Sequence, residues 1–156
     1  EMTQLAHEQM LKDIIAHRKT DESYVPVTLP SIPQLRMTRR IRGTAVLDTE
    51  DAHTRCASSV GMISNWKKRG PVYEVPFETL FCSGCENMFA AGRCISVTDS
   101  MWDVSRVIPA CAVTGEAAGT AAAMLSSLGE IDVTAVQNQL VKNGVVLHEE
   151  QLGHKL

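Results

Sequence analysis

Three stretches decide the fold of this chain: Met88-Phe89-Ala90-Ala91-Gly92-Arg93-Cys94-Ile95-Ser96, then Arg106-Val107-Ile108-Pro109, then Gly115-Glu116-Ala117-Ala118-Gly119-Thr120-Ala121-Ala122-Ala123. The first opens with an apolar run, residues 88–91, which predicts a short strand that leads into a glycine. Because glycine has no Cβ, the turn after this strand can bring its backbone within contact distance of a ligand. The first stretch therefore predicts a ligand-contacting turn at Gly92.

The third stretch belongs to the longest apolar run of the chain, from Cys111 to Leu128. A helix that is apolar on nearly every face must be buried on several sides. We expect this helix to begin among its small residues, at Gly115. Free N–H groups and the positive end of the helix dipole would then stabilise a developing anion by about 0.3–2 kcal/mol.

Composition bounds the classes of function. The chain has 156 residues, enough for one core or for one domain and part of another, and its net charge is −3. This slightly negative charge does not favour binding to nucleic acid or to an anionic membrane. No apolar run reaches the length of about 20 residues that spans a bilayer. The five cysteines are an odd number, which favours a reducing compartment; we expect a cytoplasmic protein.

The spacing of apolar residues, together with the positions of proline and glycine, predicts the remaining helices, strands and connectors. Residues 3–18 carry Ala6, Met10 and Ile14 on one face and predict a packing helix. Prolines within 24–33 predict an extended connector. The alternation from Ile41 to Leu47 predicts a strand, in which Gly43 marks a bulge or a close approach.

Shorter signals complete the pattern. Further strands are expected at 60–63, 72–76 and 79–81, with a turn at 83–84. The acidic residues 48–51 predict caps for a short helix through Arg55 or Cys56. Asp132 predicts the cap of a last helix that ends at Gly144, and residues 146–156 predict a loosely held tail.

The order of these pieces resembles the C-terminal part of the FAD-dependent oxidoreductase family. Its members end the FAD domain with an Ala-Gly-Arg-Cys-Ile-Ser turn, followed by Arg-Val-x-Pro and a helix of the type Gly-Gln-Ala-Ala-Gly-Thr-Ala-Ala-Ala. The chain matches at Ala91–Ser96, at Arg106, Val107 and Pro109, at Cys111, at Gly115 and at Ala117–Ala123. Segments near Arg39–Gly43 and Tyr73–Pro76 resemble the family's second domain, and the likeness covers most of residues 34–145.

The resemblance implies an α/β fold, as a C-terminal fragment of a two-domain Rossmann-like FAD-binding oxidoreductase. Residues 1–85 would be part of the substrate domain, 86–145 the C-terminal part of the FAD domain, and 146–156 a tail. The implied cofactor-binding residues are Gly92, Arg93, Cys94, Ile95, Ser96, Arg106, Val107, Pro109, Gly115, Ala117, Ala118 and Gly119. Gly92, Arg93 and Ser96 would lie near the pyrophosphate and ribityl chain, and 106–109 with Gly115 near the isoalloxazine ring.

The implied reaction is hydride transfer between a small organic substrate and FAD, with no nucleic acid, membrane or metal involved; an oligomer is compatible with the sequence. The chain departs from the family pattern at Asp99, where a His is usual, and at Glu116, where Gln is usual. It also lacks the Gly-x-Gly-x-x-Gly that binds the ADP half of FAD. We therefore expect a piece of a longer polypeptide, and a non-catalytic binding or assembly module is the alternative.

Several side chains keep two interpretations. Cys82-x-x-Cys85, where the family tends to have Val at the second cysteine, is either a pair of structural cysteines, which we favour, or a redox dithiol or half of a zinc site. The arginines at 36, 39, 40 and 42 either receive a carboxylate or pair with the acidic residues 48–51. We expect Arg106 to have a specific partner, because its surroundings are apolar. The catalytic base is unassigned, with Tyr73, Glu74 and Asp99 as candidates.

Overall fold

The computed structural model describes residues 1–32, 36–37, 39–85, 87–128 and 132–153. The chain divides into two compact units, Glu1–Thr38 and Arg39–Leu156. The predicted connector ends at Pro33, which lies outside the described residues. The assignment of residues 1–85 and 86–145 to the two domains of a longer protein stays a prediction.

The first unit consists mainly of one helix, α1 (Met2–Thr20), which confirms the predicted helix at 3–18. Its partly covered positions include Ala6, Met10 and Ile14, the face that periodicity predicts, but no residue of α1 is buried. The last turn carries three basic side chains, which suit the negative end of the helix dipole. After the helix, the ring of Tyr24 packs on the ring of His17 at 5.1 Å.

The second unit is built on a pair of antiparallel strands, β1 (Ser59–Ser64) and β2 (Val72–Pro76). Both confirm predicted strands. The register pairs Met62 with Glu74 and is irregular at Gly61, whose φ of +147° few side chains adopt. A Cβ at Gly61 would lie 2.6 Å from Val113 Cγ1. The glycine therefore lets a helix lie directly on the strand.

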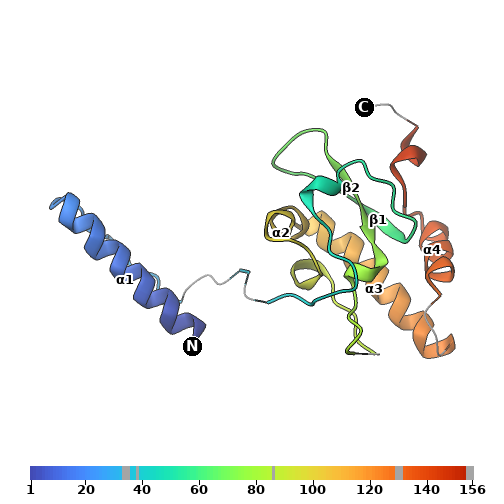
Figure 1. The fold of residues 1–156 in the computed structure, drawn as a ribbon, viewed down its shortest axis with the longest axis horizontal. Coiled ribbons are helices and arrows are strands. Elements are labelled where there is room, and N and C mark those ends of the chain that lie inside the picture. Colours follow the sequence, from blue (N-terminus) through green and yellow to red (C-terminus); the bar gives the residue numbers. More distant parts are fainter. Residues whose placement is uncertain (33–35, 38, 86, 129–131, 154–156) are drawn as a thin grey trace. The chain divides into compact units, whose positions relative to one another are not determined.

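That helix is α3 (Ile108–Leu128), which packs against β1 and follows the short helix α2 (Asp99–Ser105). Helix α4 (Val133–Lys142) contacts both α3 and β1 (Figure 1). Its cap is the predicted one, since Asp132 accepts a hydrogen bond from the N–H of Thr134 at 2.9 Å. The buried side chains of the core come from these elements and from the segments that connect them, and include Leu47, Val60, Ile63, Tyr73, Val75, Phe77, Leu80, Ile95, Val97, Met101, Ala117, Ala121, Val136, Leu140 and Leu147. Helices with a small two-stranded sheet make this a mixed α/β unit.

The predicted strand from Ile41 to Leu47 does not form. The N–H of Ile41 donates to the carbonyl of Cys94 at 2.8 Å, and the N–H of Leu47 donates to that of Ser96 at 3.2 Å. Six residue steps, from Ile41 to Leu47, thus lie opposite two, from Cys94 to Ser96, so the chain bends at 44–45 and cannot continue a ladder. Gly43 does mark a close approach, because a Cβ there would lie 2.5 Å from the carbonyl oxygen of Glu78.

Three shorter predictions are also corrected. Residues 79–81 do not form a strand: β2 ends at Pro76, and a 3₁₀ turn, Phe77–Thr79, follows, closed by a hydrogen bond of 2.7 Å from Thr79 Oγ1 to the carbonyl of Pro76. Residues 88–91 form no strand, although the N–H of Ala90 donates to the carbonyl of Leu80 at 2.7 Å. The helix capped by Asp48 spans only Thr49–Asp51 and does not reach Arg55 or Cys56. The turn at 83–84 is confirmed.

Residues 147–149 of the predicted tail are held to the rest of the unit, which corrects the loose tail expected there, whereas residues 150–153 are exposed. Leu147 is buried, and its carbonyl accepts a hydrogen bond of 2.6 Å from Ser59 Oγ on β1. A 3₁₀ turn, Glu149–Leu152, follows and is capped through the side chain of Gln151. Residues 154–156 lie outside the described part of the chain.

Across the residues that the structure describes, no single helix has the length and apolar character needed to cross a membrane. Helices α2 and α3 have enough length and apolar character only when they are counted as one segment, and the chain bends by 91° between them.

We predict that Gly43→Ala lowers the free energy of unfolding by about 1–3 kcal/mol, because the new methyl group collides with backbone at Glu78 and with the Cβ of Ser96. Urea denaturation followed by circular dichroism measures the change. Gly84→Ala is the matched control, since no atom lies within 4 Å of the position of its Cβ. Equal midpoints for the two variants would contradict the close approach at Gly43.

Candidate functional site

The predicted ligand-contacting turn is a short 3₁₀ helix, Gly92–Cys94, that lies on α3. Gly92 has a φ of +64°, and its buried N–H donates a hydrogen bond of 2.9 Å to Thr114 Oγ1. A Cβ at Gly92 would lie 3.0 Å from the sulfur of Cys111. The glycine is thus needed where it was predicted, but its close neighbour in this chain is α3.

The other residues of the turn divide into two sets. Ile95 and Ser96 are buried, and the backbone of Ser96 joins Leu47 and Thr79 through hydrogen bonds of 3.2 and 2.9 Å. Arg93 and Cys94 are exposed. The guanidinium of Arg93 forms no ion pair with any residue that the structure describes. Arg93 is therefore free to receive an anion.

Helix α3 begins at Ile108, and the predicted start at Gly115 is wrong. The N–H of Cys111 already donates to the carbonyl of Val107 at 2.9 Å, so Gly115 lies inside the helix. Proline is well tolerated in the first turn because the N–H it lacks would have no helical partner there. The chain can thus enter the helix at Pro109, and the positive end of the dipole lies at 107–110.

The small residues of α3 lie on two faces. Ala117 and Ala118 are buried in the core, whereas Gly115, Glu116 and Gly119 are exposed. No atom lies within 4 Å of the position that a Cβ would occupy at Gly115 or Gly119. Gly115 follows Cys111, the neighbour of Gly92, by one helical turn, so Cys111 and Gly115 lie on the same face of α3.

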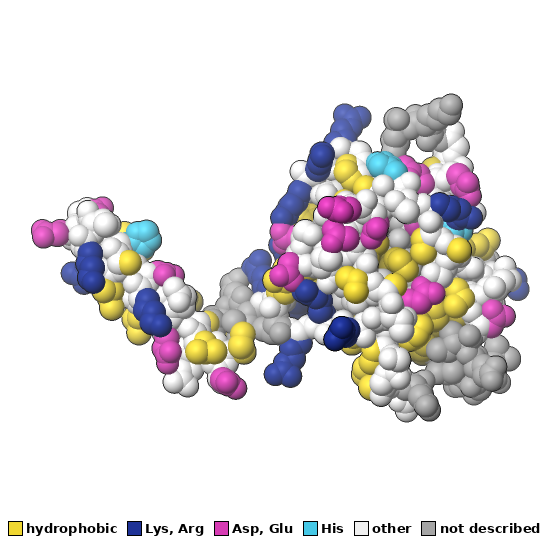
Figure 2. Space-filling model, in the orientation of Figure 1, with side chains coloured by type: hydrophobic (Ala, Val, Ile, Leu, Met, Phe, Trp, Pro, Cys, Tyr) yellow, Lys and Arg dark blue, Asp and Glu magenta, His cyan; other side chains and the backbone are white. Residues whose placement is uncertain are grey.

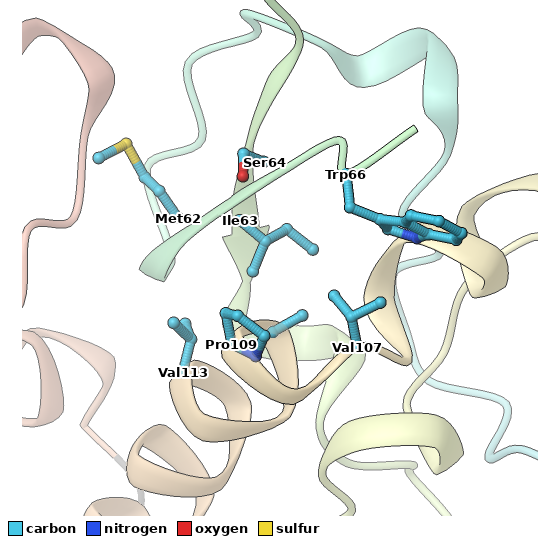
Figure 3. A pocket seen from close by; sticks show the side chains of 8 residues that line it. Met62, Ile63, Ser64, Trp66, Val107, Pro109 and Val113 are labelled. Atoms are coloured by element: carbon cyan, nitrogen blue, oxygen red, sulfur yellow. The ribbon is translucent and has the colours of Figure 1, made fainter. Parts of the chain in front are cut away.

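A pocket of about 140 Å³ opens between β1 and the first turns of α3 (Figure 3). Its lining is Met62, Ile63, Ser64, Trp66, Val107, Pro109, Ala110 and Val113. Figure 3 shows the indole of Trp66 beside Val107 at one end and Val113 toward the other. Two predicted site residues, Val107 and Pro109, thus line an apolar pocket at the positive end of α3.

The rim of this pocket is held by Asp103. Its backbone carbonyl accepts a hydrogen bond of 2.7 Å from the indole nitrogen of Trp66, and its carboxylate pairs with Lys67 and with Arg106. Those hydrogen bonds, from Lys67 first and then Arg106, hold the pKa of Asp103 below its ordinary value. Arg106 also lies over the ring of Trp102 at 5.1 Å, so it has the specific partners that we expected.

Basic side chains continue along the loop between β1 and β2, where Lys67, Lys68 and Arg69 follow one another (Figure 2). Of the four arginines at 36–42, Arg40 pairs with Asp99. This pairing matches neither of the two alternatives considered, a bound carboxylate or the acidic residues 48–51. Asp99, the position at which the resemblance implies a His, is thus engaged in an ion pair.

The other two candidate catalytic bases, Tyr73 and Glu74, make hydrogen bonds within the protein. Tyr73 is buried, and its hydroxyl accepts a hydrogen bond of 3.4 Å from Asn65 Nδ2. The buried carboxylate of Glu74 accepts hydrogen bonds from the backbone N–H of Cys56 at 2.8 Å and of Glu149 at 3.0 Å. His148 Nδ1 lies 2.8 Å from the same carboxylate. Glu74 therefore joins the C-terminal segment to β2.

Comparison with known proteins identifies the family. A family model described as FAD dependent oxidoreductase matches residues 2–140, most of the chain. The chain therefore belongs to the FAD-dependent oxidoreductase family. No curated protein and no solved structure gives a significant match.

Sequence reasoning missed helix α2 and the role of Thr114. The signal for α2 was present, because Thr98 is a good N-cap residue and its hydroxyl accepts from the N–H of Met101 at 3.3 Å. Nothing local marks Thr114 or Trp66, since the roles of these two residues depend on partners far away in sequence.

We predict that Thr114→Val destabilises the protein by about 1–3 kcal/mol, because the buried N–H of Gly92 loses its acceptor while the shape of the side chain is kept. Thr114→Ser retains the hydroxyl and should lose less. The comparison uses urea midpoints; a Val variant as stable as the Ser variant would show that this hydrogen bond does not hold the turn.

We predict a similar loss, about 1–3 kcal/mol, for Glu74→Gln, since an amide offers one acceptor oxygen where the carboxylate offers two. Glu150→Gln is the control at an exposed carboxylate, with an expected change within about 0.5 kcal/mol. Thermal unfolding monitored by circular dichroism compares them. If both variants unfold like the parent chain, Glu74 does not secure the C-terminal segment.

Proposed function

We propose that this chain forms part of the flavin site of a longer, Rossmann-like oxidoreductase that transfers hydride between a small organic substrate and FAD. FAD dependence follows from the family. The bound flavin supplies the ring that accepts or gives the hydride, whereas the protein orients it and sets its electrostatic surroundings. The observation that carries the proposal is the exposed Arg93, free of ion pairs with the described residues, on a turn that packs against α3, the helix with the open glycines.

The residues present fit this cofactor in two respects. A guanidinium such as that of Arg93 matches the geometry and charge of a pyrophosphate. The exposed backbone at Gly115 and Gly119 admits close approach, because no side chain covers it. Ile95, Ser96, Ala117 and Ala118 are buried and would act by holding the turn and α3 in place.

The pocket at the start of α3 would contact only part of the isoalloxazine. Sites for small molecules usually enclose about 300–1,000 Å³, and this pocket measures about 140 Å³. Val107 and Pro109 would provide an apolar wall, and the positive end of α3 would favour negative charge beside it by about 0.3–2 kcal/mol. The remaining walls, and the Gly-x-Gly-x-x-Gly, would come from the rest of the protein.

We also propose that the protein is cytoplasmic and that residues 86–145 form the C-terminal part of the FAD domain. The alternative, a non-catalytic binding or assembly module, is distinguished by cofactor binding to the chain itself.

We predict that added FAD raises the melting temperature of the purified chain and that its flavin fluorescence changes on binding. Arg93→Ala should weaken the affinity about tenfold or more, the equivalent of a charge-assisted hydrogen bond. Arg69→Ala, at another exposed arginine, should leave it unchanged.

The substitution at Arg93 and the cofactor titration answer different questions. Binding that is equally tight in both arginine variants would remove Arg93 from the site while leaving FAD binding intact. A chain that gains no stability from FAD at any concentration would favour the non-catalytic module.

A further inference from the structure

Cys82 and Cys85 lie at the two ends of a tight turn. The N–H of Cys85 donates to the carbonyl of Cys82 at 3.3 Å, and both thiols are free. Such a hydrogen bond is typical of a β-turn, in which the first and fourth Cα atoms lie less than about 7 Å apart. Disulfides join Cα atoms about 4.4–6.8 Å apart. The backbone of this turn therefore suits a bridge between the two sulfurs.

The two side chains already interact. A hydrogen bond to Cys82 raises the pKa of the Cys85 thiol, with a smaller contribution from the charge on Cys82. This bond favours the protonated form of Cys85, which suits Cys85 to act second, on a mixed disulfide already formed at its neighbour. Cys85 is exposed and Cys82 is half-buried, which leaves the pair accessible to solvent-borne reactants.

The stems of the loop that carries this turn are fixed. The rings of Phe81 and Phe89 lie 6.3 Å apart, and both pack on Phe77, at 5.2 and 5.9 Å. The loop itself extends from the body of its unit (Figure 1). Bridging the turn would thus leave the core undisturbed.

A zinc site is the less favoured use of the pair. Structural zinc takes four ligands, mostly Cys and His. Among the residues that the structure describes, no group of three or more His, Cys, Asp or Glu side chains is placed to hold a metal ion.

We propose that Cys82 and Cys85 form a redox-active dithiol that exchanges with small disulfides of the glutathione class. The Cys82 thiolate attacks one sulfur of the small disulfide, whose S–S bond breaks; one thiolate leaves and a mixed disulfide forms. Cys85 then loses its proton to solvent and attacks the sulfur of Cys82, which expels the second thiolate. The two protein thiols are oxidised to one disulfide, and the small disulfide is reduced to two thiols.

The test is a glutathione redox titration of the whole chain, followed by alkylation of the remaining thiols and tryptic mass spectrometry. Cleavage at Arg69 and Arg93 yields a peptide of residues 70–93 whose cysteines are Cys82 and Cys85. The next peptide, 94–106, contains Cys94 alone. We expect the first peptide to lose both alkylation sites together, with the mass of an internal disulfide, and to regain both with dithiothreitol.

Two comparisons keep the test decisive. The exposed Cys94 has no partner within its peptide, so it should retain bound glutathione and serves as the control in the same sample. Cys85→Ser, at an exposed position, should trap glutathione on Cys82. Independent glutathionylation of Cys82 and Cys85, like that of Cys94, would overturn the proposal, and so would protection of both thiols by added zinc. No flavin takes part, so this outcome is separate from that of the FAD titration.

Discussion

The contact on which the second unit depends is that of the Gly92 turn with helix α3. The N–H of Gly92 donates to the hydroxyl of Thr114, and a Cβ at Gly92 would lie only 3.0 Å from the sulfur of Cys111. This contact brings the segment 94–98 beside Leu47 and sets the direction in which the chain enters α2. The same helix supports β1 on another side. Strand, turn and connecting segments thus share one support.

Much of the fold was predictable where local signals agree with long-range packing. Helix α1, strands β1 and β2 and helix α4 follow from periodicity and caps that act within a few residues. The segment from Ile41 to Leu47 has equally regular alternation, yet it forms no strand. Its hydrogen-bonding partner at 94–96 is too short to pair with it, and nothing in the local sequence reveals that length.

For the candidate site too, the sequence predicted local features but not the contacts between segments distant in sequence. The need for glycine at 92 was predictable, because a turn after an apolar run often requires φ > 0, but the identity of its neighbour was not. Small residues correctly indicated tight packing at Ala117 and Ala118. The same composition cannot separate them from Gly115 and Gly119, which differ only in the face of α3 that they occupy. The start of α3 was misplaced because Pro109 was not taken as a first-turn residue.

The buried carboxylate of Glu74 has a consequence for the order in which this unit opens. Its hydrogen-bond donors come from the segment before β1 and from the segment after α4, two parts of the chain that are distant in sequence. Detaching either one would leave a charge with too few donors inside the protein, which is costly. Fraying from the C-terminal side is therefore discouraged, and amide protons near Cys56 and Glu149 should exchange with solvent in the same cooperative event.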